Sequence, residues 1–278
     1  MPTDTQTLKT ILEDAIAIAR GAGEILLEGW TALEASRAMA VEFKSTDIDP
    51  VTEYDLRSEQ FIVGELRRLY PGHRIVGEEG GAYEQPAQPD GAGHVWHVDP
   101  LDGTVNFAHG FPLFCVSLGL YIEGQPAVAV VYNPALGQMY AAARGLGATC
   151  NGRPMRVSAT PDLRRALLIT GFAYDTHVSD SNLGNFLAFQ HTAQATRRIG
   201  SAALNLCFTA AGQMDGHWEM KVKPYDIAAG VLLVREAGGT VTDFDGGDAM
   251  LASGRIVASN GLIHQAMLDV LRSTGDRD

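Results

Sequence analysis

The most informative stretch of this sequence is Asp99-Pro100-Leu101-Asp102-Gly103-Thr104-Val105-Asn106-Phe107. Asp99 ends a run of mostly apolar residues, 95–98, whose pattern indicates a strand, so its carboxylate should lie at a sheet edge. Pro100 should force the following backbone out of the strand, so that Asp102 turns back toward the same point. An isolated Asp-Gly pair usually marks only a turn. The whole run is too specific for that interpretation.

The same stretch offers further polar backbone groups. The Leu101 carbonyl is free to act as an oxygen ligand. Gly103 and Thr104 begin a short turn or helix whose N–H groups could cradle a phosphate oxygen. The run therefore combines carboxylates with a candidate anion cradle.

Two more acidic clusters complete the pattern: Gly77-Glu78-Glu79 and Pro224-Tyr225-Asp226-Ile227-Ala228-Ala229-Gly230. Alone, the two glutamates would be a solvated pair, and Asp226 and Asp55 would be helix-start acids favoured by the helix dipole. Together with the central run, they indicate one cleft. Hard divalent cations prefer such oxygen ligands, and two of them can hold a phosphate ester for attack by water. We therefore expect a metal-binding phosphatase site.

The composition supports a compact enzyme. The chain has 278 residues, of which 46% are hydrophobic and 19% charged. A net charge of −12 argues against nucleic acid as a partner, because phosphate backbones require clustered Lys and Arg. Such a charge should also repel a phosphate substrate, unless bound divalent metals invert the local field.

The cellular context is an expectation from three features. Cys115, Cys150 and Cys207 are widely spaced in apolar surroundings and should be buried free thiols of a reducing compartment. No signal peptide is visible in the first residues. The longest apolar stretch, residues 111–122, is too short to cross a bilayer. We expect a cytoplasmic protein without a membrane partner.

The hydrophobic periodicity predicts alternating helices and strands. Helices are expected at about 5–30, 52–70, 181–195, 201–213, 224–237 and 261–272. Strands are expected near 40–44, 74–77, 95–99, 113–123, 127–132, 138–143, 166–170, 216–220, 240–243 and 256–259. This order fits a layered α+β or α/β protein. We expect a single unit, residues 1–278, with an N-terminal α+β half at about 1–145 and a C-terminal α/β half at about 146–278.

The chain resembles the inositol monophosphatase family of Mg-dependent, lithium-sensitive phosphatases over nearly its whole length. The three acidic segments occur in the family's order and at its approximate spacing. Lys44, Asp49, Val51, Thr52 and Asp55 match its N-terminal signature, and Gly200-Ser201-Ala202 with Glu219 match its substrate-facing segment. The resemblance implies an alternating α/β/α/β/α sandwich, which the family shares with fructose-1,6-bisphosphatases.

The resemblance also implies roles for individual residues. Glu78, Asp99 and the Leu101 carbonyl would hold a first Mg²⁺, and Asp99, Asp102 and Asp226 a second, with a weaker third ion near Glu78. Glu78 and Thr104 would position and activate the attacking water, with Asp55 hydrogen-bonded to Thr104. The substrate would meet Asp102, Gly103, Thr104, Gly200, Ser201, Ala202, Glu219 and Asp226.

Two residues depart from the family pattern. Tyr225 replaces the usual Trp before the third metal-binding Asp, which should preserve the packing while altering the pocket wall. His97 replaces a usually apolar residue and should be a satisfied core histidine, or one that supports the metal ligands from behind, rather than a ligand itself. A homodimer is a family expectation, with Arg197 and Arg198 near the contact.

The predicted reaction is Mg²⁺-dependent release of phosphate from a small monoester, foremost myo-inositol 1-phosphate. Other phosphatase activities remain open: on histidinol phosphate, on fructose 1,6-bisphosphate, or on adenosine 3′,5′-bisphosphate. A hypothesis of another class is a regulatory binding protein with residual phosphatase activity. The intact acidic set weighs against it, since a binding module would not need every ligand.

Overall fold

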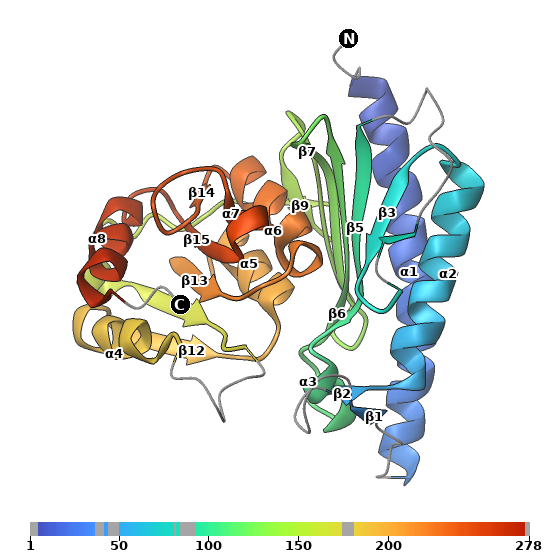
Figure 1. The fold of residues 1–278 in the computed structure, drawn as a ribbon, viewed down its shortest axis with the longest axis horizontal. Coiled ribbons are helices and arrows are strands. Elements are labelled where there is room, and N and C mark those ends of the chain that lie inside the picture. The colour runs from blue at the N-terminus through green and yellow to red at the C-terminus, as the bar shows by residue number, and fades with distance from the viewer. Residues whose placement is uncertain are drawn as a thin grey trace.

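The computed structural model describes residues 5–36, 42–43, 50–80, 82–83, 93–173 and 181–275. Its elements form five layers that alternate between helices and sheets (Figure 1). Helices α1 (Thr5–Ser36) and α2 (Glu53–Leu69) cover the outer face of the first sheet. Helices α5 (Ala202–Ala210) and α6 (Pro224–Glu236) lie between the two sheets. Helices α4 (Leu183–Thr192) and α8 (His264–Thr274) cover the far face of the second sheet. The predicted alternating α/β/α/β/α sandwich is confirmed.

The first sheet has eight strands in the order β10-β9-β8-β7-β6-β5-β3-β4. Strands β3 and β5 pair in parallel, and the other neighbours pair antiparallel. The strands are β3 (Arg74–Gly77), β4 (Ala82–Tyr83), β5 (His94–Asp102), β6 (Cys115–Ile122), β7 (Gln125–Asn133), β8 (Gln138–Ala143), β9 (Ala148–Cys150) and β10 (Arg153–Pro154). A separate pair joins β1 (Glu42–Phe43) to β2 (Pro50–Val51), and the short helix α3 (Thr104–Ala108) follows β5.

The second sheet has five strands in the order β12-β11-β13-β15-β14. Its strands are β11 (Leu167–Thr170), β12 (Ala195–Arg198), β13 (Gly216–Met220), β14 (Thr240–Thr242) and β15 (Arg255–Ser259). Strand β11 pairs in parallel with β12 and β13, and β15 pairs antiparallel with β13 and β14. A 3₁₀ turn (Leu163–Arg165) precedes β11, and the short helix α7 (Met250–Ser253) precedes β15.

Helix α6 occupies the centre of the molecule. Its residues 227–234 are all buried, as expected for a helix that is apolar on every side. Pro224 lies in its first turn, where a missing N–H costs nothing, and Gly238 follows its end with φ of 89°. Asp226 therefore stands at the half-buried start of a buried helix, between the two sheets.

Several predicted boundaries need correction. The helix predicted at 181–195 ends at Thr192, because residues 195–198 pair with β11 and form the edge strand β12. The turn-rich segment after residue 145 contains β9 and β10, which extend the first sheet to Pro154. The helix predicted from residue 261 begins at His264, since the Asn260 side chain accepts the Leu262 and Ile263 N–H groups in a preceding turn. The predicted division into halves at residue 145 stays a prediction.

Other expectations concern single residues. All three cysteines are free thiols, with Cys115 and Cys207 buried and Cys150 half-buried. His97 packs edge-on against Tyr121, but its buried Nδ1 has no hydrogen-bond partner among the described residues, so the expectation that its ring nitrogens are satisfied is wrong for this atom. Of the predicted strand at 40–44, the structure describes residues 42–43. No helix within the described ranges is long and apolar enough to cross a membrane.

Candidate active site

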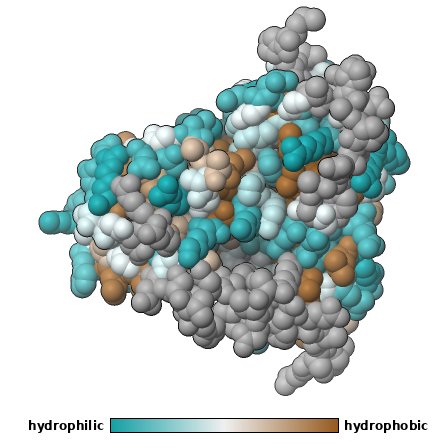
Figure 2. All heavy atoms as spheres, in the orientation of Figure 1, coloured by the Kyte–Doolittle hydropathy of each residue, from teal (hydrophilic) through white to brown (hydrophobic). Residues whose placement is uncertain are grey.

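A cleft of about 750 Å³ lies between the two sheets, and this face of the molecule is hollowed between its two halves (Figure 2). One side, which we call the first-sheet wall, is formed by Glu78, Asp99, Leu101, Asp102 and Thr104. The opposite side, the second-sheet wall, is formed by Gly171, Gly200, Ser201, Ala202 and Glu219. Asp226 and Tyr225 line the cleft at the start of α6. All predicted metal-binding and substrate-facing residues therefore border one cavity.

The pairing of two parallel strands brings Glu78 and Asp99 together. Gly77 is the register partner of Val98, so the next residues, Glu78 just after the end of β3 and Asp99 within β5, lie side by side. Glu59 of α2 fixes the departing loop, because its buried carboxylate accepts the N–H groups of Glu79 at 2.9 Å and Gly80 at 2.6 Å. Sequence reasoning missed Glu59, whose position on a helix gave no signal of this contact.

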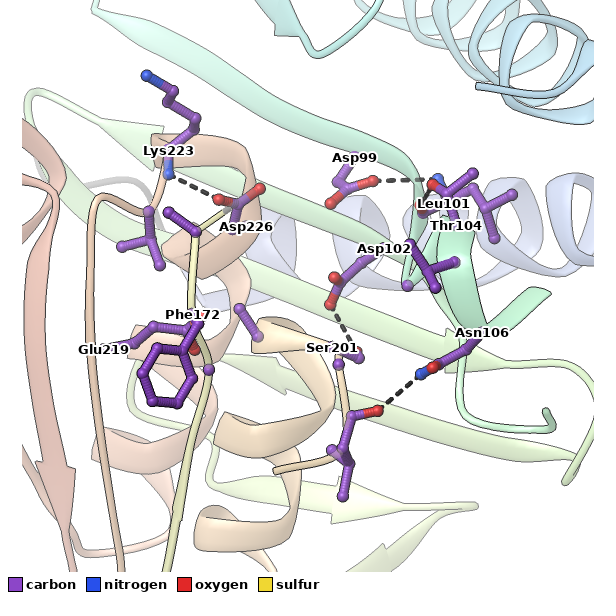
Figure 3. Close-up of a pocket in the computed structure, with 18 of the residues that line it drawn as sticks. Asp99, Leu101, Asp102, Thr104, Asn106, Phe172, Ser201, Glu219, Lys223 and Asp226 are labelled. Atoms are coloured by element: carbon purple, nitrogen blue, oxygen red, sulfur yellow. Dashed lines mark hydrogen bonds between the residues drawn. The ribbon is translucent and has the colours of Figure 1, made fainter. Parts of the chain in front are cut away.

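A bulge in β5 brings Asp102 to the same point. Asp99 pairs with Ser117 and Asp102 with Cys115, so three steps along β5 oppose two along β6. In a strand without a bulge, residues three positions apart face opposite sides of the sheet, whereas the bulge lets Asp99 and Asp102 face the same side. The strand thus continues through Pro100, contrary to the expected exit. Figure 3 shows Asp99, Asp102 and Asp226 pointing toward the same space.

Hydrogen bonds hold these carboxylates in place. Asp99 Oδ1 accepts the Leu101 N–H at 3.0 Å. Asp102 Oδ2 accepts the Ser201 hydroxyl at 2.6 Å and the Ala203 N–H at 2.7 Å, at the start of α5. Asp226 Oδ2 accepts the Lys223 N–H at 2.6 Å. Each carboxylate is therefore oriented by backbone donors near a turn or helix start.

Thr104 is tied to Asp55 behind the first-sheet wall. The Thr104 hydroxyl lies 3.1 Å from Asp55 Oδ1 and 3.0 Å from the Leu101 carbonyl, and it can donate its one proton to either. Asp55 is fully buried and also accepts the N–H and hydroxyl of Thr52, in the capping box of α2. The implied contact between Asp55 and Thr104 is present.

The turn at Gly103 requires glycine. Its φ is 91°, and a Cβ there would lie 2.9 Å from the Leu113 carbonyl oxygen. Asn106 then joins the two walls, because its Nδ2 donates to the carbonyls of Leu113 and Ile199, each at 2.7 Å. Asn106 belongs to the run 99–107, but the sequence did not reveal its partner Ile199, which lies 93 positions away along the chain.

Crowding of like charges perturbs the acids in the cleft. Burial raises the pKa of Asp99 well above its ordinary value, and the carboxylates of Glu78, Asp102 and Asp226 raise it further. Burial also raises the pKa of Asp226. It raises the pKa of Asp102 to about 6, against the lowering effect of the Ser201 and Ala203 hydrogen bonds. The cleft therefore holds more negative charge than it can stabilise by itself.

This donor set suits hard divalent cations, which prefer carboxylate and carbonyl oxygens and would offset the repulsion between the acids. Across the described ranges, no three His, Cys, Asp or Glu side chains are arranged so that they could hold one metal ion in the conformations seen. Several of their oxygens accept protein N–H or O–H groups instead. Lys44 and Asp49, from the N-terminal signature, lie outside the described residues.

Comparisons with known proteins agree with this geometry. Residues 7–275 match the model of the inositol monophosphatase family. The chain is 43% identical over 274 residues to an inositol-1-monophosphatase of Synechocystis sp., covering 98% of this chain and 91% of that protein. It is 42% identical to the Nus factor SuhB of Pseudomonas aeruginosa, covering 95% and 97%. The solved inositol monophosphatase of Anabaena (Nostoc) sp. superimposes with a TM-score of 0.84 at 39% identity, covering 97% and 98%.

The two names carried by these relatives differ, so likeness alone does not fix the substrate. The family model nevertheless spans nearly the whole chain, and five of the acidic residues that prompted the resemblance border one cleft: Glu78, Asp99, Asp102, Glu219 and Asp226. The chain therefore belongs to the inositol monophosphatase family of metal-dependent phosphatases and is a phosphoric monoester hydrolase.

Proposed function

We propose that this enzyme hydrolyses myo-inositol 1-phosphate to myo-inositol and phosphate with the help of Mg²⁺. The observation that carries the proposal is the shared cleft: Glu78, Asp99, Asp102, Asp226 and Glu219 border one cavity. The first four suit divalent ions and the last suits a polyol. A net charge of −12 makes cations necessary for any phosphate to enter.

The proposed ligands follow from this arrangement. Glu78, Asp99 and the Leu101 carbonyl would hold a first ion, and Asp99, Asp102 and Asp226 a second. A third would lie near Glu78 with mostly water ligands. When bound, these ions supply Lewis-acid activation of water and neutralise charge on the ester. The residues that hold them also set where the phosphate can lie.

Thr104 and Asp55 are the proposed positioning pair for the attacking water, together with Glu78. In this proposal the Thr104 hydroxyl donates its proton to Asp55 Oδ1, which lies 3.1 Å away, and not to the Leu101 carbonyl, so that a lone pair of the Thr104 oxygen faces away from Asp55. That lone pair can accept a hydrogen bond from a water and orient it toward phosphorus. Glu78, which follows β3 and borders the cleft, would accept the second proton of that water.

The substrate body should lie along the second-sheet wall. Glu219, Gly200, Ser201 and Ala202 border this side, opposite the proposed ions, with Gly103 and Thr104 near the phosphate. Glu219 can accept hydrogen bonds from ring hydroxyls. Tyr225 contributes an aromatic surface with a polar end. Histidinol phosphate remains the strongest competitor, since a glutamate could also pair with its ammonium group.

The setting of the enzyme is proposed on the same grounds. We propose a homodimer in the cytoplasm that acts on a small phosphorylated metabolite and has no nucleic-acid partner. The net charge of −12 supports the absence of a nucleic-acid partner. Sedimentation analysis of the full chain tests the dimer, and a gel-shift assay with RNA and DNA tests the partner. A sedimentation boundary at the monomer mass would contradict the dimer, and a shifted nucleic-acid band at low salt would contradict the absence of a nucleic-acid partner.

A substrate panel tests the central proposal. Phosphate release from myo-inositol 1-phosphate, histidinol phosphate, fructose 1,6-bisphosphate and adenosine 3′,5′-bisphosphate is measured with Mg²⁺, with and without lithium. We expect the highest kcat/KM for the inositol ester and inhibition by lithium. A higher kcat/KM for another ester, or indifference to lithium, would contradict it. If the protein releases phosphate from none of these esters, the hypothesis of a regulatory binding protein is favoured.

A further inference from the structure

The Glu219 carboxyl is fixed against the backbone of the second sheet. Glu219 lies near the end of β13 and is 7% exposed. A Cβ at Gly171 would lie only 2.0 Å from Glu219 Oε1, so the carboxyl packs directly on the Gly171 backbone. This close approach is possible because residue 171 is glycine. One side of Glu219 faces the cleft, and its other neighbours lie inside the protein.

Those interior neighbours are His217 and Asn205. His217 is fully buried, and its Nε2 lies 3.6 Å from Glu219 Oε2. The Asn205 side chain donates to the same Oε2 at 3.5 Å. His217 Nδ1 lies 3.2 Å from the Ile169 carbonyl oxygen, which can only accept, so Nδ1 carries a proton. Among the residues that the structure describes, His217 Nε2 and Asn205 Oδ1 have no hydrogen-bond partner.

Whether the contact between Glu219 Oε2 and His217 Nε2 is favourable depends on the protonation of the two side chains. Burial lowers the pKa of His217 to about 4, so with Nδ1 protonated its Nε2 presents a lone pair. A bare Glu219 carboxylate would then face that lone pair, and two acceptors in a buried site repel each other. One added proton between Glu219 Oε2 and His217 Nε2 removes this repulsion, whether it is bound to the oxygen or to the nitrogen.

The surrounding charges favour the added proton. Burial raises the pKa of Glu219 to about 8, and Asp102 across the cleft raises it further, whereas Asn205 and the more distant Arg198 lower it. Asp226 also interacts with Glu219 as a like charge. The neighbouring strand β15 places the apolar Ile256 opposite Glu219.

We propose that Glu219 and His217 share one proton at neutral pH and form a net-uncharged pair, which makes the second-sheet wall select a neutral polyol phosphate over a phosphorylated amino alcohol. The inference rests on the proposed function, because it concerns the same substrate pocket. A bare carboxylate would attract an ammonium group strongly. An uncharged pair gains little from that cation and still exchanges hydrogen bonds with hydroxyl groups.

The first test is the pH dependence of substrate preference. The ratio of kcat/KM for myo-inositol 1-phosphate to that for histidinol phosphate is measured between pH 7 and 9 with saturating Mg²⁺. Ionisation of phosphate affects both substrates alike and cancels in the ratio. We expect the ratio to fall several-fold as pH rises and Glu219 loses the shared proton. A ratio that is flat or rises with pH would overturn the inference.

Two variants distinguish the effect of the shared proton from a general effect on packing. His217→Leu removes both the nitrogen that stabilises the added proton and the lone pair that repels a bare Glu219 carboxylate, so the fall in the ratio should move to lower pH. In Glu219→Gln, which cannot ionise, the ratio should lose the fall caused by Glu219 and keep only the change due to the ionisable groups of histidinol phosphate itself. A His217→Leu enzyme with an unshifted profile contradicts the proposal.

A direct titration keeps the proposal testable if His217→Leu does not fold. The Glu219 carboxyl carbon is followed by NMR in the Mg²⁺-loaded wild-type protein and assigned by its loss in Glu219→Gln. We expect titration far above the ordinary value of about 4.3, and titration at that ordinary value would refute the shared proton. Failure of the proposed function looks different, because no ester in the panel would release phosphate.

Discussion

The two walls of the cleft hold their polar groups by different means. The first-sheet wall is set by strand register and by bonds between near neighbours in sequence, such as Asp99 to Leu101 at 3.0 Å. The second-sheet wall depends on distant partners, such as Ser201, which bonds Asp102 from 99 positions away. The first wall presents several carboxylates that repel one another. The second presents one, Glu219, backed by a histidine. The comparison indicates that the first wall handles the phosphate chemistry and the second handles the choice of substrate.

The sharpest way to break this division is Asp99→Asn. Asp99 is common to both proposed ion sites, so the variant should lose Mg²⁺ affinity and at least ~10³-fold in kcat/KM for every ester alike. Calorimetric Mg²⁺ binding and phosphate release measure the two effects. Asp269→Asn, which changes an exposed acid on α8, is the matched control and should keep wild-type values. A loss limited to one substrate would contradict the division.

The next largest effect should come from the water-positioning pair. Thr104→Val keeps the shape of the side chain but removes the hydroxyl that bonds Asp55. We expect kcat to fall by ~10²-fold or more, as for loss of a positioned proton acceptor, with KM nearly unchanged. Thr104→Ser keeps the hydroxyl and should retain most of the activity. A raised KM with normal kcat would place Thr104 in substrate binding instead.

Substitution of Glu59 tests how far the first-sheet wall depends on the hydrogen bonds that hold the loop carrying Glu78. Glu59→Gln removes one of two acceptors for the loop that carries Glu78. Mg²⁺ should bind about tenfold more weakly, in the range for groups that orient metal ligands, while the relative preference among esters stays constant. Glu65→Gln, a more exposed substitution on the same helix, is the control. A changed substrate preference would mean that the walls are not separable.

The smallest effect should come from Ser201→Ala on the second wall. The Ser201 hydroxyl donates to Asp102 and accepts the Leu204 N–H as the N-cap of α5. Its loss should lower the free energy of unfolding by about 1 kcal/mol, measured by urea denaturation. We also expect a few-fold rise in KM for the inositol ester. A fall in kcat as large as that of Thr104→Val would remove the distinction between the walls.

The sequence predicted the first wall better than the second, for physical reasons. The acidic clusters and the start of α6 at Pro224 depend on local patterns, and those predictions agree with the structure. Strand β12 was missed because the polar run Ala195–Arg198 becomes a strand only by pairing with β11. The support from Glu59, Asn106 and His217 also went unrecognised. Each of these residues acts through a partner that only the fold brings near.

Crystallography with Mn²⁺ tests the central claim most directly, because Mn²⁺ takes oxygen ligands like those of Mg²⁺ and scatters anomalously. The account predicts at least two anomalous peaks in the cleft, one bonded by Glu78 and Asp99 and one by Asp99, Asp102 and Asp226. It also predicts that Asp99→Asn crystals lose both peaks. Wild-type crystals in which the four carboxylates bind no common ion at millimolar Mn²⁺ would contradict the account.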